Sequence, residues 1–116
     1  MSKNNPLYIK ADFLAKQVYY VSQNFPKSEM YGLTSQLRRA AISVILNIVE
    51  GFARQSKNEY RRFLLISFGS LEETRYILEF AFGQKYVSQQ EFTTLNGVAN
   101  EVAKIIWTIV NTKNSD

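Results

Sequence analysis

The sequence predicts an all-α fold, an antiparallel up-down-up-down four-helix bundle in a single domain. Only two of the 116 residues are proline and five are glycine, so helices can run through long stretches without interruption. Within these stretches apolar residues recur at alternating spacings of three and four, which is typical of a helix that packs in a bundle. The connections between the stretches are short, which favours antiparallel neighbours. We expect helices over residues 6–25, 33–54, 57–82 and 89–111.

The first helix has clear signals at both ends. Asn5 is a good N-cap, and Pro6 suits the first helical position, where an amide hydrogen is not needed. Pro26 is expected to end the helix, because the residue before a proline is pushed out of the α region. In the connection that follows, Met30 and Tyr31 are expected to pack over the end of the bundle. The residues predicted to face the bundle are Leu7, Ala11, Leu14, Val18, Val21 and Phe25.

The second helix is apolar over most of its circumference. One row is predicted to face the bundle, namely Leu37, Ala41, Val44, Ile48 and Phe52. A further group covers much of the remaining surface, namely Ala40, Ile42, Ile45, Leu46 and Val49. A helix with solvent along one side does not need so many apolar residues. We therefore expect this helix to contact other subunits as well as its own bundle.

The third helix begins with a capping box, in which Ser56 is the N-cap and Glu59 lies at N3. Gly83 is expected to end it. Gly69, near the middle, costs up to about 1 kcal/mol relative to alanine, so we expect a neighbouring backbone to approach closely there. The row predicted to face the bundle is Tyr60, Leu64, Ser67, Leu71, Thr74, Leu78 and Ala81.

The fourth helix begins with a second capping box, formed by Ser88 and Glu91. Trp107 lies off its apolar row, on a part of the helix that does not face the bundle. The row itself is Phe92, Leu95, Ala99, Val102, Ile106 and Ile109.

The composition argues against several classes of function. The chain has no histidine and no cysteine, which removes the commonest general base, thiolate nucleophiles, disulfides and thiolate metal sites. It also lacks a glycine-rich phosphate loop and a Glu-x-x-His pair. We expect no catalysis, no cofactor and no metal. The longest nearly apolar run, residues 40–49, is too short to span a membrane, and the N-terminus lacks the apolar core of a signal peptide. A cytoplasmic protein without a membrane partner is expected.

A row of polar residues runs along the second and third helices. Its members are Arg39, Ser43, Asn47 and Glu50, with Ser70 and Glu73. The row could be a binding or catalytic constellation. It could equally be a structural polar network, in which Glu50 or Glu73 pairs with Arg39 and Asn47 fixes the register between helices. We favour the network, because an unpaired buried carboxylate is costly and polar residues in helical seams usually specify register.

The stretch QLRRAAISVILNIVEGFARQSKNEYRRFLLISFGSLEETRYIL resembles the bacterial four-helix-bundle proteins that are encoded in intervening sequences of 23S ribosomal RNA genes. The family pattern Q-x-x-R-A-x-x-S-x-x-x-N-x-x-E-G, followed by G-S-L-x-E, is met at Gln36, Arg39, Ala40, Ser43, Asn47, Glu50, Gly51, Gly69, Ser70, Leu71 and Glu73. The resemblance implies a homopentameric, barrel-like assembly and no settled activity. A similar bundle is the accessory protein of diversity-generating retroelements, a basic pentamer that associates with nucleic acid and a reverse transcriptase. RNA, DNA and a nucleic-acid enzyme are therefore candidate partners.

The positive charge of the chain is concentrated between residues 38 and 62. The net charge is +4, and this window holds the expected nucleic-acid-binding residues, Arg38, Arg39, Arg54, Lys57, Arg61 and Arg62. They form two patches about 24 Å apart along the second helix, and the patch at the turn between the second and third helices is the tighter. In a pentamer that patch would become a ring of about twenty positive charges, which suits a phosphate backbone without base readout. The other interpretation is a solvated surface that Glu50 or Glu59 partly neutralises.

The predicted function is therefore a non-catalytic homo-oligomer that associates with nucleic acid through its basic patches. The alternative is a structural or protein-interaction module that binds no nucleic acid. The tyrosines and Trp107 could stack on bases, but at helical spacing we expect them in the core or in contacts between subunits. Binding of labelled RNA and DNA across a salt series separates the two functions.

Overall fold

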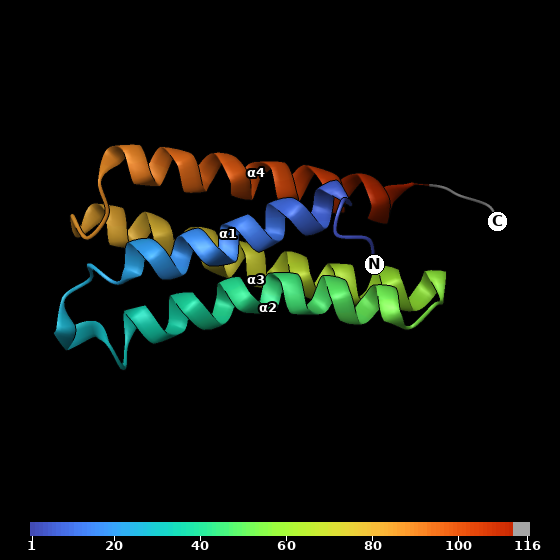
Figure 1. The fold of residues 1–116 in the computed structure, drawn as a ribbon, viewed down its shortest axis with the longest axis horizontal. Coiled ribbons are helices and arrows are strands. Elements are labelled where there is room, and N and C mark those ends of the chain that lie inside the picture. The colour runs from blue at the N-terminus through green and yellow to red at the C-terminus, as the bar shows by residue number, and fades with distance from the viewer. Residues whose placement is uncertain (113–116) are drawn as a thin grey trace.

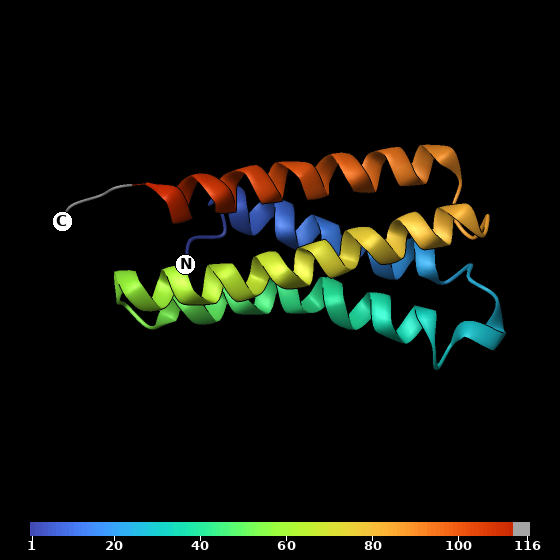
Figure 2. The same ribbon diagram turned by 180° about the vertical axis from the view of Figure 1, so that it is seen from behind.

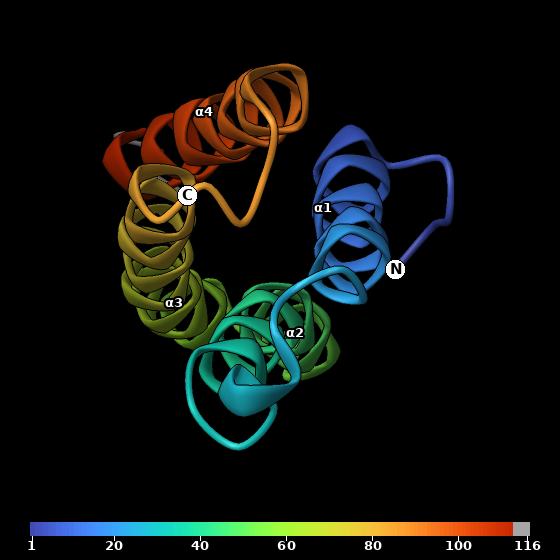
Figure 3. The ribbon, with the colours of Figure 1, turned by 90° about the vertical axis from the view of Figure 1, so that its left-hand side faces the viewer.

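The computed structural model describes residues 1–112, in which four α-helices and one 3-10 turn follow one another. They are α1 (Pro6–Ser22), η1 (Lys27–Glu29), α2 (Leu33–Ala53), α3 (Lys57–Gly83) and α4 (Gln89–Asn111). The chain reverses direction from each helix to the next (Figure 1), and the same four antiparallel rods are seen from behind in Figure 2. Viewed along its length, the bundle is a square in which α1 and α3 each contact α2 and α4 (Figure 3). The predicted all-α class is confirmed.

The helices start where the sequence predicts, but α1 ends earlier than predicted. The Asn5 side chain accepts a 2.9 Å hydrogen bond from the amide of Leu7, with Pro6 at the first helical position. The helix stops at Ser22, and the next three amides bond to carbonyls three residues back, from Gln23 to Phe25. This tighter turn keeps Phe25 in the core at 6% exposure. The expected seam therefore persists beyond the helix.

The end of α3 differs from the prediction. Gly83 lies within the helix, and the left-handed residue is Lys85, with a φ of 66°. The amide of Tyr86 donates to the carbonyl of Ala81 at 2.8 Å, and the amide of Lys85 donates to that of Phe82 at 3.0 Å. These two bonds form a Schellman motif that satisfies the last carbonyls of the helix. A lysine thus takes the position that the sequence pattern assigns to glycine.

The predicted bundle-facing rows form most of the core, while Tyr60, Phe92 and Ile109 of these rows are partly buried and pack against it. Buried residues include Leu14 and Val18 of α1, Leu71 and Leu78 of α3, and Val102 and Ile106 of α4. Phe52 was expected to complete the row of α2, but its side chain is 46% exposed. Gly51 is the buried residue at this end of α2.

Close packing between α2 and α3 occurs at Gly51 and not at Gly69. A Cβ atom added to Gly51 would lie 2.6 Å from the Cβ of Phe63, whereas one added to Gly69 would meet nothing within 4 Å. Further along the same seam, the Ser67 hydroxyl donates a 2.7 Å hydrogen bond to the carbonyl of Val44. The expected approach of a backbone at Gly69 is therefore wrong within the single chain, where Gly69 is exposed.

The helix starts are capped in three different ways. Ser88 and Glu91 form the predicted reciprocal capping box at α4. At α3 the Ser56 hydroxyl accepts from the amide of Glu59, while the Glu59 carboxylate pairs with Arg62. At α2 the N-cap position is Gly32, and the carboxylate of Glu29 accepts from the amide of Leu33 at 3.2 Å. Within residues 1–112 no helix combines the length and the apolar character that are needed to cross a membrane.

Candidate nucleic-acid interface

The uncharged members of the polar row form a network across the α2–α3 seam. The hydroxyl groups of Ser43 and Ser70 share a hydrogen bond of 2.8 Å between the two helices. The side-chain amide of Asn47 donates to the carbonyl of Ser43 at 2.8 Å and to its hydroxyl at 3.0 Å. Of these bonds, the one between Ser43 and Ser70 joins the two helices, whereas both bonds of Asn47 stay within α2, so the expected bond of Asn47 across the helices is not made among residues 1–112.

The charged members of the row do not join this network. Glu50 pairs with Arg54 one turn further along α2, at 3.0 Å, and not with Arg39. Arg39 and Glu50 lie eleven residues apart, about 16 Å along the helix axis, which is too far for an ion pair. Arg39 and Glu73 are both exposed, and no ion pair joins them among residues 1–112. Both charged groups stay in contact with water, so neither needs an ion-pair partner to offset a loss of hydration.

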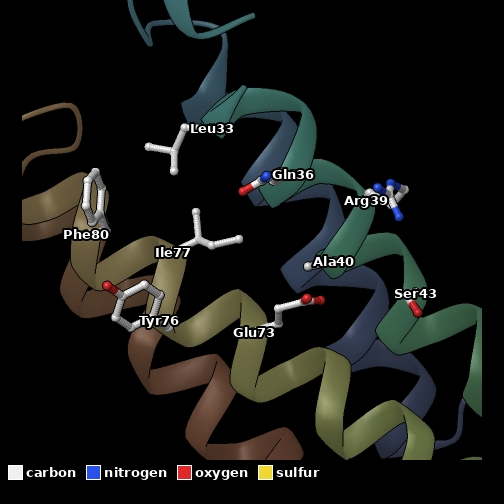
Figure 4. A pocket seen from close by; sticks show the side chains of 9 residues that line it. All are labelled: Leu33, Gln36, Arg39, Ala40, Ser43, Glu73, Tyr76, Ile77 and Phe80. Carbon is white, nitrogen blue, oxygen red and sulfur yellow. The ribbon is translucent and has the colours of Figure 1, made fainter. Parts of the chain in front are cut away.

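A groove of about 510 Å³ lies between the first half of α2 and the second half of α3. Figure 4 shows Glu73 reaching from α3 towards α2, opposite Gln36 and Ala40. The wall on the side of α3 continues with aromatic and aliphatic side chains. The groove is lined by Leu33, Gln36, Arg39, Ala40, Ser43, Glu73, Tyr76, Ile77 and Phe80. Its lining holds one carboxylate, Glu73, and one cation, Arg39, so it offers phosphate no net positive charge.

Two arginines of the basic patch at the turn between α2 and α3 are paired with neighbouring carboxylates. Glu59 pairs with Arg62 at 3.2 Å and with Arg54 at 3.7 Å, while Glu50 takes a second contact from Arg54. The hydrogen bond from Arg62 lowers the pKa of the Glu59 carboxyl, so this group stays ionised. Arg61 donates to the carbonyl of Val110 and thereby ties α3 to the end of α4. Lys57 is exposed at the start of α3.

Two of the three guanidinium groups of the turn patch also lie against one aromatic ring. The guanidinium carbon of Arg54 is 4.9 Å from the centre of the Phe63 ring, and that of Arg62 is 4.6 Å from it. The ring and the two carboxylates together hold these two arginines against the surface of their own chain. Two of the four basic residues of the patch that looks tighter in sequence are therefore paired with carboxylates within the chain.

The second patch consists of Arg38 and Arg39, and no carboxylate neutralises either of them within residues 1–112. Arg38 donates from Nε to the buried hydroxyl of Ser22 at 2.8 Å, and its guanidinium lies 4.8 Å from the centre of the Tyr19 ring. Both of these partners are neutral. Arg39 is exposed on the adjacent position of α2. Within residues 1–112 no carboxylate forms an ion pair with either arginine.

Beside these arginines is a depression of about 440 Å³, which we call the tyrosine–arginine hollow. It lies between the second half of α1, the residues after η1 and the first turns of α2. Tyr31, expected to pack over the bundle end, is instead 97% exposed, and Met30 is 45% exposed. Phe25 and Tyr86, with ring centres 5.5 Å apart, take that packing position. The hollow is lined by Tyr19, Met30, Tyr31, Thr34, Ser35, Arg38, Arg39 and Ile42.

Sequence reasoning named the arginines of the hollow as site residues, but it treated its tyrosines only as members of a larger aromatic set that could stack on bases and was expected in the core or in subunit contacts. Tyr19 precedes Arg38 by nineteen residues and reaches it only because α1 and α2 lie side by side. The available signal was its place beside Val18 and off the apolar row of α1, which predicts a side chain that faces away from the core. Tyr31 carried no signal, because its connection has no helical period.

Several exposed apolar side chains lie on the outer side of α2 and α3. On α2 it includes Leu46, which is 58% exposed, and Val49, at 38%. On α3 it includes Ile66, Tyr76 and Phe80, which are 43%, 64% and 42% exposed. These residues recur at helical spacing on the side opposite the core, so both helices carry an inner and an outer apolar row. This agrees with the expectation that the helix pair has more apolar surface than one bundle can bury.

Acidic side chains do not gather into a metal site in the part of the chain that the structure describes. Within residues 1–112 there is no group of three or more acidic, histidine or cysteine ligands that could hold a metal ion. Glu50 and Glu59 are both engaged by arginines at the turn.

Comparison with known proteins shows what this chain is similar to. The family model described as "23S rRNA-intervening sequence protein" matches residues 3–108. A crystal structure of a protein of unknown function from the S23 ribosomal protein family of Bacteroides thetaiotaomicron superposes with a TM-score of 0.81 at 23% sequence identity. The match covers 91% of this chain and 99% of that one. At this identity the likeness establishes the shared fold. No curated protein matches the sequence.

Proposed function

The chain belongs to the 23S rRNA-intervening sequence protein family, and we propose that it is a non-catalytic homo-oligomer that holds nucleic acid without reading its sequence. The observation that carries this proposal is the Arg38–Arg39 pair on the second turn of α2. Its two guanidinium groups have neutral partners or none among residues 1–112. Guanidinium groups bind phosphate oxygens well, and this contact is independent of base identity.

The outer apolar row of α2 and α3 supports the homo-oligomer. Exposed apolar residues at helical spacing on two adjacent helices form a surface that a second copy of the chain could bury. Gly69 lies in this surface with open space above it, so the close approach of a helix from another subunit would meet no side chain. A homopentamer, the assembly expected for the family, would carry five copies of the arginine pair, about ten positive charges that act on one strand.

A second function is favoured by the turn patch. Arg54 and Arg62 are both neutralised within the chain, so part of the positive charge that suggested nucleic acid is already used in the fold. If the same holds for Arg38 and Arg39 in the assembled protein, the chain is a structural or protein-interaction module. A nucleic-acid enzyme could then be its partner through protein contacts alone.

The two functions are separated by direct binding. Fluorescence anisotropy with labelled single- and double-stranded RNA and DNA should detect binding of the wild-type chain that weakens steeply as salt rises. Arg39→Glu should weaken it for every sequence tested, while Arg54→Glu, at an already compensated position, should change it less. If no form of nucleic acid binds at about 50 mM salt, the nucleic-acid function is wrong and the protein-interaction function stands. Light scattering on the same sample tests the oligomer.

A further inference from the structure

We propose that the tyrosine–arginine hollow binds one nucleotide of a single strand, with the base on Tyr31 and the phosphate on Arg39. This inference rests on the proposed function, because it names the form of nucleic acid and the residues that would hold it. RNA and DNA share the required chemistry of an unpaired base joined to a phosphate.

The size and lining of the hollow suit a nucleotide. Its volume of about 440 Å³ falls within the range of small-ligand sites. Its lining includes apolar or aromatic side chains, Tyr19, Met30 and Ile42. It also includes two cations, Arg38 and Arg39, and small hydroxyl side chains. Apolar and cationic side chains in one lining match a nucleotide, which joins a flat base to a charged phosphate.

Tyr31 is the side chain that can stack on a base. It is 97% exposed, so its ring faces are open to a ligand. The other aromatic ring of the hollow, Tyr19, already lies against the Arg38 guanidinium. Stacking on an aromatic ring tolerates every base, because each base has a π-face. The hollow would therefore hold a strand without selecting its sequence, as the proposed function requires.

The two arginines have different tasks. Arg38 is held by Ser22 and Tyr19 through Nε and one face of its guanidinium, which leaves its terminal N–H groups as donors towards the hollow. Arg39 is exposed, and no partner within residues 1–112 holds it, so it can turn towards a phosphate. Arg38 would provide a fixed positive field, and Arg39 would make the direct contact.

A single strand fits this hollow better than a duplex. In a double helix the faces of the bases are covered by their neighbours, and only their edges are reachable in the grooves. A tyrosine that stacks on a base face therefore needs an unpaired base. The expected order of affinity is single-stranded RNA and DNA above their duplexes, at equal salt.

The experiment uses the full chain in its native oligomer and labelled oligonucleotides of about 12 nucleotides, comparable to known single-strand site sizes. Oligo-uridine RNA, oligo-thymidine DNA and their duplexes are compared by anisotropy across a salt series. Tyr31→Ala should weaken single-strand binding about tenfold, while Tyr31→Phe should retain it. The matched control is Tyr20→Ala, because Tyr20 is 63% exposed on α1 but does not line the hollow.

Two further measurements make the result specific to the hollow. Arg39→Gln should reduce the slope of log affinity against log salt by about one for each bound hollow, with Arg62→Gln as the control at a compensated arginine. Oligonucleotides that contain 5-iodouridine should cross-link to Tyr31 or Tyr19 under ultraviolet light, as identified by mass spectrometry of the peptides. Circular dichroism should show wild-type helicity for each variant, since the side chains concerned are exposed.

The outcomes distinguish this inference from the function on which it rests. If the wild-type chain binds but Tyr31→Ala binds equally well, the hollow is not the site, and the proposed function survives. If duplexes bind as tightly as single strands, the stacking argument is wrong. If Tyr31→Ala alters the mass in light scattering, the hollow is a contact between subunits, and the inference is overturned. Absence of binding by every nucleic acid overturns both proposals.

Discussion

The phenolic hydroxyl of Tyr86 donates a 3.1 Å hydrogen bond to the carboxylate of Glu29, fifty-seven residues earlier in the chain. The other carboxylate oxygen accepts from the amide of Leu33, so one side chain both caps α2 and holds the α3–α4 connection. Burial raises the pKa of Tyr86, and the hydrogen bond to Glu29 and its negative charge raise it further. The tyrosine therefore stays protonated and able to donate over the whole neutral range.

Tyr86→Phe should make the bundle less stable, because it removes the donor and leaves the ring contact with Phe25 in place. The urea midpoint of unfolding should fall by about a few tenths molar, since one hydrogen bond is lost. Tyr76→Phe is the matched control, because Tyr76 is 64% exposed and its hydroxyl makes no hydrogen bond among residues 1–112. Equal midpoints for Tyr86→Phe and the wild type would show that the hydrogen bond contributes nothing.

Gly51→Ala and Gly69→Ala should change stability in opposite directions. The new Cβ at position 51 would lie 2.6 Å from the Cβ of Phe63, which would force α2 and α3 apart at a cost of about 1–3 kcal/mol. At position 69 the new methyl group meets nothing within 4 Å in the single chain, so the higher helix propensity of alanine should stabilise the isolated bundle by up to about 1 kcal/mol. Urea unfolding of both variants measures this difference. A stabilising Gly51→Ala would contradict the close packing described for the α2–α3 seam.

Leu46→Glu should lower the oligomer mass without unfolding the bundle. Leu46 is 58% exposed on the outer row of α2, so a carboxylate there is solvated in a single chain and buried in an assembly that uses this row. Light scattering should report a smaller particle, and circular dichroism should report unchanged helicity. Thr93→Glu, at an exposed position of α4, is the control. An unchanged mass for Leu46→Glu would exclude this row as a subunit contact.

Acid should weaken the turn between α2 and α3 through Glu59. The hydrogen bond from Arg62 lowers the pKa of this carboxyl in the folded chain below its usual 4.5. A depressed carboxyl pKa contributes stability above the unfolded value, and this contribution is lost as pH falls through the folded value. The urea midpoint should therefore begin to fall below about pH 4.5 and do so less steeply in Arg62→Gln. The effect should shrink in high salt, since Arg62 is exposed and Glu59 is only half-buried. Identical pH profiles for the two proteins would contradict it.

Local signals in the sequence predicted the helices well. Asn5, Ser56 and Ser88 mark the starts of α1, α3 and α4, because a cap depends only on residues within one turn. The inner apolar rows were equally clear, since the 3.6-residue period of a helix relates sequence directly to a face. The prediction failed at Gly83 and Lys85, where the motif that ends the helix accepts a non-glycine residue at positive φ.

The candidate site was less predictable, because its properties depend on residues far apart in the chain. Six basic residues could be counted in the sequence, but tertiary contacts determine which of them are paired with a carboxylate. Glu59 compensates Arg54 and Arg62 at a tight turn, while Arg38 meets a hydroxyl and an aromatic ring from α1. Spacing along the sequence therefore did not show which arginines meet a carboxylate and which meet a neutral group.

The sequence by itself determined the all-α class, the order of the helices and the inner face of each, because these depend on caps and periodicity within a few turns. The tertiary structure decided which basic residues pair with a carboxylate. It also decided that α2 and α3 pack closely at Gly51 and not at Gly69, and that Tyr31 faces solvent. Each of these is settled by a neighbour from another segment, Glu59, Phe63 or the Phe25–Tyr86 pair. Side-chain surroundings arise only when the helices pack, and so does the surface that could hold a strand.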